Sequence, residues 1–255
     1  MNNDADDVKN ADQGKRALIK MSAGLLAGAA ALASSSAAEV FAGSTKMKVL
    51  LVNGSPNEKG CKYTGLLEIA ETLQKEDVDT EIFQIGKKPI SGCVACYSCR
   101  KTHPGRCAIS DLVNDCLETA KATDGFIFGT PVHFAAAGGA ITSFMDRLFF
   151  SADSSTFYLK PAAAIVSARR GGTTSAFDQL NKYFTIKEMP VISSSYWNMI
   201  HGSTPADVKQ DVEGLQTLRT LARNMAWFLR CKDAGAKAGV SLPEKEAPLR
   251  TNFIR

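Results

Sequence analysis

Four of the seven cysteines lie close together in the middle of the chain, as Cys93-x2-Cys96-x2-Cys99-x7-Cys107. Gaps of two residues bring successive sulfurs within reach of one metal centre, and a fourth thiol a few residues later can close the cage. The same residues can instead form disulfides in an oxidising compartment, stay as free thiols, or hold zinc in a tetrahedral site. The spacing therefore indicates metal or redox chemistry and leaves open which of these applies.

A loop of small and hydroxyl residues lies in the stretch MKVLLVNGSPNEKGCKYTGLL, residues 47–67. It follows a short Val- and Leu-rich run that is typical of a buried parallel strand, and it precedes a helical pattern with Thr64 as the expected N-cap. Unpaired N–H groups and the dipole of a helix N-terminus favour an anion. The loop lacks the GxxxxGK[ST] and GxGxxG spacings of other phosphate sites. It therefore predicts a phosphorylated cofactor of another kind.

Two further loops follow apolar segments later in the chain. The strand-like run at 125–130 is followed by PVHF (131–134) and by a helical pattern that contains MDRLF (145–149). The run PAAAIVSARRGG (161–172) ends in a glycine-rich turn. An open α/β sheet binds its ligand at the carboxyl ends of its strands, so we expect these three loops to share one ligand.

These motifs resemble those of the flavodoxin-like NADPH-dependent FMN reductase family, in particular its iron–sulfur flavoprotein branch. The resemblance rests on the GSP-x3-G…T loop, the PVHF and MDRLF segments and the compact cysteine motif, and it extends over residues 47–255. It implies bound FMN, a [4Fe-4S] cluster on the four cysteines, NAD(P)H as a donor and a dimer or tetramer. The cysteine segment follows the expected second strand, so we expect it on the side where the flavin loops gather. The FMN-binding residues that it implies are Ser55, Asn57, Gly60, Tyr63, Thr64, Thr130, Pro131, Val132, His133, Phe134, Arg169, Gly171 and Gly172.

Two of these residues are also expected to take part in catalysis. His133 stands where relatives usually have Tyr beside the flavin ring, and its imidazole could donate a proton; the alternative is a neutral side chain packed at the pocket wall. Arg169 could stabilise the anionic reduced ring, or it could be a surface charge at a strand end. The phosphate loop departs from its relatives at Cys61, Lys62 and Tyr63, where they run from Gly into Asn-Thr, so the hydroxyl that meets the phosphate stays open.

The rest of the pattern predicts a single α/β domain over residues 43–240, with an extended tail at 241–255. Apolar runs and helical spacings alternate, which is typical of a parallel sheet with helices on both faces. We expect a three-layer, flavodoxin-like sandwich whose five strands have the order 2-1-3-4-5. The expected strands are 47–53, 79–84, 125–130, 162–167 and 190–195, and the expected helices are 65–76, 111–123, 138–150, 173–186 and 209–232.

The amino-terminal residues have the composition of an export signal. KRALIK (15–20) precedes a weakly apolar, Ala-rich run, and Val40-Phe41-Ala42 predicts cleavage before Gly43. The basic segment resembles the twin-arginine consensus, with Lys in place of the first Arg. Residues 1–42 are therefore expected to direct the protein to the periplasm or another extracytoplasmic location, and it would be cytoplasmic if the signal is not used. A net charge of +4 without a basic stripe predicts no nucleic-acid partner.

The function expected from these features is that of an FMN-dependent oxidoreductase reducing a small acceptor. Quinones, free flavins, nitro or azo compounds and metal ions are acceptors of this kind. The alternative is an iron–sulfur flavoprotein that passes single electrons to a redox protein partner. A third hypothesis is a binding module that has kept the fold and lost turnover.

Overall fold

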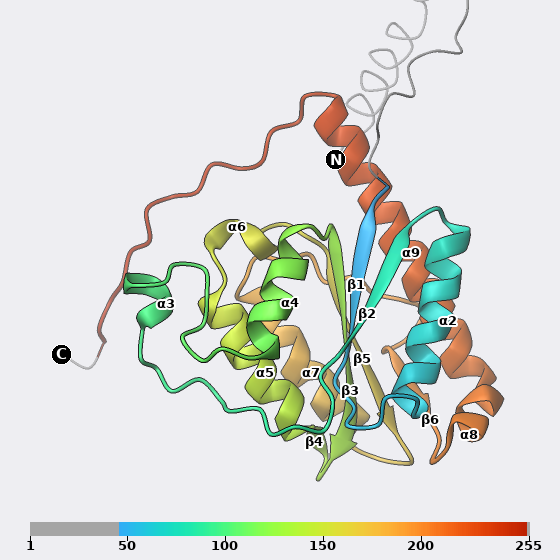
Figure 1. The fold of residues 1–255 in the computed structure, drawn as a ribbon. Coiled ribbons are helices and arrows are strands. Elements are labelled where there is room, and N and C mark those ends of the chain that lie inside the picture. Colours follow the sequence, from blue (N-terminus) through green and yellow to red (C-terminus); the bar gives the residue numbers. More distant parts are fainter. Residues whose placement is uncertain (1–45, 254–255) are drawn as a thin grey trace, which may run out of the picture. The chain divides into compact units, whose positions relative to one another are not determined.

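The computed structural model describes residues 46–253, which form an open parallel β-sheet with helices on both faces (Figure 1). The strands are short runs rich in Val, Ile, Leu, Phe and Ala, whose side chains pack well when a sheet is buried on both faces. Within the described residues, five parallel strands follow the order β2-β1-β3-β5-β6. The bounds are β1 Lys48–Asn53, β2 Asp79–Gln84, β3 Gly125–His133, β5 Ala162–Ala168 and β6 Met199–His201; a short β4, Ala136–Ala137, pairs antiparallel with the end of β3.

Two layers of helices cover the sheet (Figure 1). One face packs a core containing Leu50, Phe128 and Phe144 against α4, α5 and α7. The other packs Leu51, Ile69 and Leu218 against α2 and α9. The helix bounds are α2 Cys61–Lys75, α3 Ser98–Lys101, α4 Leu112–Lys121, α5 Gly139–Ser151, α6 Ser154–Phe157, α7 Thr173–Thr185, α8 Pro205–Gln210 and α9 Val212–Lys237.

The predicted flavodoxin-like order 2-1-3-4-5 is confirmed, but the fifth strand is not at 190–195. Val191 makes one isolated bridge with Ala162, and the edge strand proper, β6, pairs with the end of β5. A side-chain turn separates the two, since the hydroxyl of Ser194 bonds to the carbonyl of Tyr196 and to the side chain of Asn198. The apolar run that indicated a strand is therefore interrupted before it can form a ladder.

Helix α2 begins earlier than the sequence predicts. Its N-cap is Gly60, and Thr64 lies inside the first turn with its hydroxyl donating to the carbonyl of Gly60 at 3.3 Å. Gly60 has no side chain to cap the helix, so the spacing of apolar residues alone gave no sign of this start. The consequence is that the phosphate loop is shorter and the helix N-terminus lies closer to the strand than expected.

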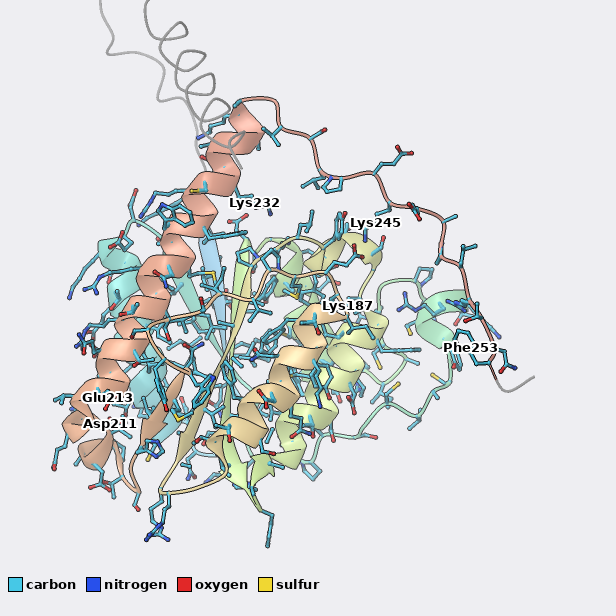
Figure 2. All side chains as sticks on the ribbon, turned by 180° about the vertical axis from the view of Figure 1, so that it is seen from behind. Lys187, Asp211, Glu213, Lys232, Lys245 and Phe253 are labelled. Atoms are coloured by element: carbon cyan, nitrogen blue, oxygen red, sulfur yellow. The ribbon has the colours of Figure 1, made fainter. Side chains whose placement is uncertain are left out.

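The ends of the domain bear on two of the predictions. The predicted signal at residues 1–42 lies outside the described residues. After α9, residues 240–252 form no helix or strand; Lys245 pairs with Glu188 at 3.1 Å, and its Nζ lies 3.4 Å from the ring centroid of Tyr158 (Figure 2). No helix among residues 46–253 has both the length and the apolar character needed to cross a membrane.

Candidate functional site

The loop after β1 is fixed to the neighbouring strands by hydrogen bonds. The N–H of Gly54 donates to the carbonyl of Gly129 on β3 at 2.8 Å. Gln84, at the end of β2, accepts from the Asn53 side chain and donates to the carbonyl of Ser55, both at 2.6 Å. The Oδ1 of Asn53 accepts from the N–H of Ser55. These hydrogen bonds pair the side chains of Asn53 and Gln84 with the backbone at the base of the loop, and they hold the loop in one conformation.

The amino end of α2 opens directly onto this loop. Its N-cap, Gly60, provides no side-chain hydrogen bond, and its first turn contains no acidic residue. The first N–H groups of a helix have no intrahelical partner, and the dipole makes this end positive. The loop and the helix end together therefore form a site that favours an anion, and no acidic side chain of the first turn of α2 fills it.

The loop after β3 is closed on itself by Thr130. This buried hydroxyl donates to the carbonyl of Pro131 and accepts from the N–H of Gly138. At the tip, Phe134 and Ala135 have positive φ angles of 50° and 59°, and the Phe134 side chain is fully exposed. A bulky residue in the left-handed region with its ring in solvent is a strained arrangement of the kind found at binding sites.

The loop after β5 touches the loop after β3. Gly172 has a φ of 90°, and a Cβ there would lie 2.7 Å from the Cα of Ala135 and 2.9 Å from Cγ1 of Val132. Gly172 is also the N-cap of α7, again without a side-chain cap. Arg169 and Arg170, just before this turn, are exposed and form no ion pair among residues 46–253. The two loops thus form one continuous wall beside the phosphate loop.

The four clustered cysteines line a single cavity. Cys93, Cys96, Cys99 and Cys107 share this cavity with Arg147 and Phe150, and all four are free thiols. Cys99 is buried and Cys107 is half-buried, whereas Cys93 and Cys96 are exposed. Within residues 46–253, no three side chains of His, Cys, Asp or Glu are already placed to hold one metal ion. The donor types suit a metal centre, while the exposed part of the segment is not in a ligating arrangement.

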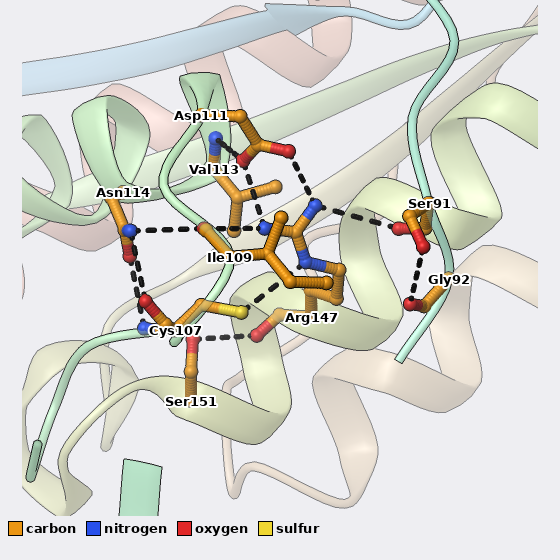
Figure 3. Close-up of polar contacts among 9 residues, drawn as sticks. All are labelled: Ser91, Gly92, Cys107, Ile109, Asp111, Val113, Asn114, Arg147 and Ser151. Carbon is orange, nitrogen blue, oxygen red and sulfur yellow. Dashed lines mark hydrogen bonds and ion pairs between the residues drawn. The ribbon is translucent and has the colours of Figure 1, made fainter. Parts of the chain in front are cut away.

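Arg147 is the residue that connects this segment to the body of the domain (Figure 3). Its side chain is 1% exposed and makes a two-pronged ion pair with Asp111 at 2.6 and 2.8 Å. Its Nε donates to the sulfur of Cys107 at 3.3 Å, and its remaining N–H groups bond to the carbonyls of Ser91 and Ile109. Burial disfavours the charged form of Asp111, but hydrogen bonds from Arg147 and a backbone N–H outweigh it and lower the pKa of this carboxyl.

A second clamp holds the backbone of Cys107. The buried side chain of Asn114 accepts from the N–H of Cys107 at 2.9 Å and donates to its carbonyl at 3.0 Å (Figure 3). Asn114 belongs to α4, so Cys107 is fixed by side chains from two helices. The sequence gave no sign of either clamp: Arg147 lies 40 positions from Cys107, and Asn114, although only 7 positions away, belongs to no motif that marks the pairing.

The cysteine segment lies elsewhere than expected. The sequence suggested the side where the three loops gather, but the cavity contacts Phe150 and Ser151 at the carboxyl end of α5. Helix α5 begins at Gly139 beside the loops and rises 1.5 Å per residue, so its far end is roughly 15 Å away. The expectation failed because the chain runs back along α5 after leaving β2.

The remaining three cysteines lie outside this cavity. Burial raises the pKa of the Cys61 thiol, and its sulfur lies 3.6 Å from the carbonyl of Gly202, so it is a packed thiol rather than an activated one. Cys116 is fully buried in the core, and burial raises its pKa strongly. Cys231 is exposed.

Comparison with known proteins now decides the family. A model of the family described as NADPH-dependent FMN reductase matches residues 47–204, more than half of the chain. This chain belongs to the NADPH-dependent FMN reductase family. Membership places it among FMN-dependent oxidoreductases.

Proteins similar to this chain carry the name iron–sulfur flavoprotein. One from Methanocaldococcus jannaschii is 29% identical over 190 residues, which cover 71% of this chain and 96% of that protein. One from Methanosarcina thermophila is 25% identical over 184 residues, which cover 70% of this chain and 93% of that protein.

Solved structures agree on the fold. RosB with bound 8-demethyl-8-formylriboflavin-5'-phosphate has a TM-score of 0.58 at 14% identity, over 81% of this chain and 92% of that one. FerB, an NAD(P)H:acceptor oxidoreductase of Paracoccus denitrificans, has a TM-score of 0.53 at 15% identity, over 73% and 98%. At such identities the likeness establishes the fold alone.

The FMN reductase fold brings the predicted FMN-binding residues to one edge of its sheet. They occupy the ends of three parallel strands, and two contacts join their loops, Gly54 to Gly129 and Gly172 to Ala135. Some of the hydroxyls are already engaged, since Thr64 bonds to Gly60 and Thr130 bonds within its own loop. The residues of each loop are Ser55, Asn57, Gly60, Tyr63 and Thr64 after β1; Thr130, Pro131, Val132, His133 and Phe134 at the end of β3; and Arg169, Gly171 and Gly172 after β5.

Several features of this edge fit FMN. The uncapped end of α2 suits a phosphate, and Gly54 and Gly172 leave no room for a Cβ where the backbone closes around the site. The amine of Lys62 is buried without a hydrogen-bond partner beside the same loop. An unpartnered amine and an uncapped helix N-terminus on the same turn of α2 are groups that an anionic ligand would satisfy.

Lys62 was not predicted from the sequence as a residue of this site. It was noted as a departure from the family pattern but was given no role. A signal was present, because Lys62 occupies the same helical face as the apolar Leu66, Ile69 and Leu73. A charged residue at a core position needs an explanation beyond packing.

Proposed function

We propose that this chain is an FMN-dependent oxidoreductase that transfers electrons to a small acceptor such as a quinone, a free flavin, a nitro or azo compound or a metal ion. The observation that carries the proposal is the fixed loop that leads into the uncapped amino end of α2, at the edge where two further loops meet. NAD(P)H is the donor that the family implies.

The described residues would divide the work between binding and chemistry. The loop after β1 holds the phosphate, and the loops after β3 and β5 flank the ring. Bound FMN supplies the redox chemistry, accepting and donating electrons singly or as a hydride. His133 is proposed to donate a proton at the ring, and Arg169, exposed beside the turn at Gly172, to balance negative charge on it.

The test is a visible spectrum of the protein purified without oxygen, with iron and sulfide measured on the same sample. Flavin absorption bands that are bleached by NAD(P)H and restored by a quinone are the expected result. A colourless protein that also fails to bind added FMN would refute the proposal.

A second candidate is electron transfer to a protein partner through an iron–sulfur cluster and FMN. It is favoured by the common cavity of Cys93, Cys96, Cys99 and Cys107, and by the naming of the relatives as iron–sulfur flavoproteins. These four thiolates would hold a [4Fe-4S] cluster, with Cys93 and Cys96 moving inward to complete the set.

Replacing Cys99 or Cys107 by serine should separate the two candidates. If a cluster is bound, either variant loses the iron, the sulfide and the broad visible absorption but keeps stoichiometric FMN, because the flavin edge lies at the other end of α5. Cys231→Ser, exposed and outside the cavity, is the matched control and should keep both. If the wild-type protein contains no iron even after anaerobic reconstitution, the cluster is excluded and the function is that of a simple FMN reductase.

We also propose that residues 1–42 export the protein by the twin-arginine route, which carries folded proteins, and that the mature domain forms a dimer or tetramer. An exported enzyme is separated from cytoplasmic NAD(P)H, so its donor would be a periplasmic or membrane-bound carrier. Detection of the mature protein only in the cytosol after cell fractionation would exclude this location.

A further inference from the structure

Lys62 is a lysine in a place where an unpaired charge is costly. It is the second residue of α2, its side chain is 1% exposed, and its Nζ is buried without a hydrogen-bond partner among the described residues. A buried ammonium group without a partner is disfavoured by several kcal/mol, so such a group loses its proton. Burial accordingly lowers the pKa of Lys62 well below its usual value.

The stem of Lys62 packs against β3 at Gly129, the residue that is bonded to the phosphate loop. Helix side chains lean toward the helix N-terminus, and the N-terminus of α2 faces the phosphate loop. The stem of Lys62 lies across Gly129, where a Cβ would be 2.6 Å from its Cδ and 3.1 Å from its Cγ. Gly129 also accepts the hydrogen bond from Gly54, the first residue of the loop. The stem of Lys62 therefore packs against the strand residue to which the phosphate loop is bonded.

We propose that Lys62 is the residue by which this chain recognises the phosphate of its cofactor, and that its amine pairs with that phosphate and makes the site select FMN over riboflavin. Two independent features converge here, the uncapped helix end and an orphaned amine beside it. Each lacks an anion in the described residues, and one phosphate satisfies both. This inference rests on the proposed function, because it assumes that the edge binds a flavin.

The pairing requires a proton. The neutral amine takes one proton from solvent when the phosphate arrives, and no other bond forms or breaks. The strand residues beside Lys62 are Gly129 and Ile165, and neither has a titratable side chain. Leu218 of α9, which packs against the same helix, has none either. Cys61 is the titratable group whose charge acts on Lys62, and Asp207 of α8 acts in turn on Cys61. FMN binding is thus expected to weaken as pH rises, while riboflavin binding is not.

The experiment compares the affinities of the apoprotein for FMN and for riboflavin in wild type, Lys62→Met and Lys75→Met. Met keeps the length and apolar stem without the amine, and Lys75 is an exposed lysine at the far end of the same helix. We expect Lys62→Met to lose roughly 10- to 100-fold in FMN affinity, the range for a hydrogen bond to a charged group. Riboflavin affinity should stay within about threefold, and Lys75→Met should match wild type for both ligands.

Calorimetry in two buffers of different ionisation enthalpy gives a readout that needs no variant. Wild type should take up close to one proton on binding FMN and none on binding riboflavin. An unchanged ratio of FMN to riboflavin affinity in Lys62→Met, or no proton uptake by wild type, would overturn the role of Lys62 while leaving the flavin site intact. Failure of wild type to bind either flavin would instead refute the proposed function.

Discussion

Replacing Gly172 by alanine should destabilise the domain and weaken FMN binding together. The φ of 90° at this position is costly for a residue with a Cβ, by about 1–2 kcal/mol. The added Cβ would also lie 2.7 Å from the Cα of Ala135, so backbone must move, at a further cost of about 1–3 kcal/mol. For a domain of this size, the midpoint of thermal unfolding should fall by roughly 5–15 °C.

The neighbouring glycine provides the matched control. A Cβ at Gly171 would meet nothing within 4 Å, and its φ lies outside the left-handed region. Gly171→Ala should therefore change stability by less than about 0.5 kcal/mol. Thermal unfolding of both variants, with an FMN titration, measures the contrast. Equal midpoints for the two would mean that the loops after β3 and β5 are not in the contact described.

Replacing Arg147 by methionine should have the largest effect on stability of any substitution near the cysteine cavity. It removes one partner of an ion pair in which Arg147 is 1% and Asp111 is 29% exposed, and it removes the hydrogen bonds that Arg147 donates to the carbonyls of Ser91 and Ile109. Because the guanidinium is fully buried but Asp111 is only partly so, the loss should be roughly 2–3 kcal/mol, below the range of about 3–5 kcal/mol for a fully buried pair. Urea unfolding should report this loss.

Two further variants test the cause of that loss. Arg230→Met breaks a more exposed pair with Glu76 and should cost less than about 1 kcal/mol. Adding Asp111→Asn to Arg147→Met removes the stranded charge but keeps an N-cap on α4, and should recover part of the stability. If Arg147→Met proves no less stable than Arg230→Met, the network does not anchor the cysteine segment.

The pair also sets a pH dependence with a definite sign. The pKa of Asp111 is lower in the folded protein, so its contribution is complete above the unfolded-state value of about 4. Wild type should lose this stability as pH falls through the folded-state pKa. Arg147→Met removes the main interaction that lowers the pKa, so its unfolding free energy should fall less steeply below pH 4.

Much of the fold could be predicted because its signals are local. The apolar runs that became β1, β3 and β5 are buried on both faces and therefore stand out in the sequence. The edge strand β6 could not be found in this way, since MIH is too short to show a pattern and its place depends on pairing with Val166–Ala168. Gly60 as the start of α2 was missed because a cap without a side chain leaves no motif.

The loops of the candidate site could be proposed from the sequence, whereas its tertiary contacts could not. Ser55, His133 and Gly172 were named from turns that follow strands, and the fold places those turns at one edge. The pairing of Arg147 with Asp111 joins residues 36 positions apart, and no spacing rule reveals it. Lys62 could have been found as a charge on an apolar stripe, but its lack of a partner is visible only in three dimensions.

For the proposed cluster, the uneven anchoring of the four cysteines implies an order of assembly. Cys107 is locked by Arg147 and Asn114 and Cys99 is buried, so two thiols are in place once α4 and α5 have packed. Cys93 and Cys96 remain exposed, next to Ala95 with a positive φ. Iron from solution would then first meet the exposed Cys93 and Cys96, and the cluster would be completed on Cys99 and Cys107, which are already in place. The metal would be acquired by a folded domain rather than being needed to fold it.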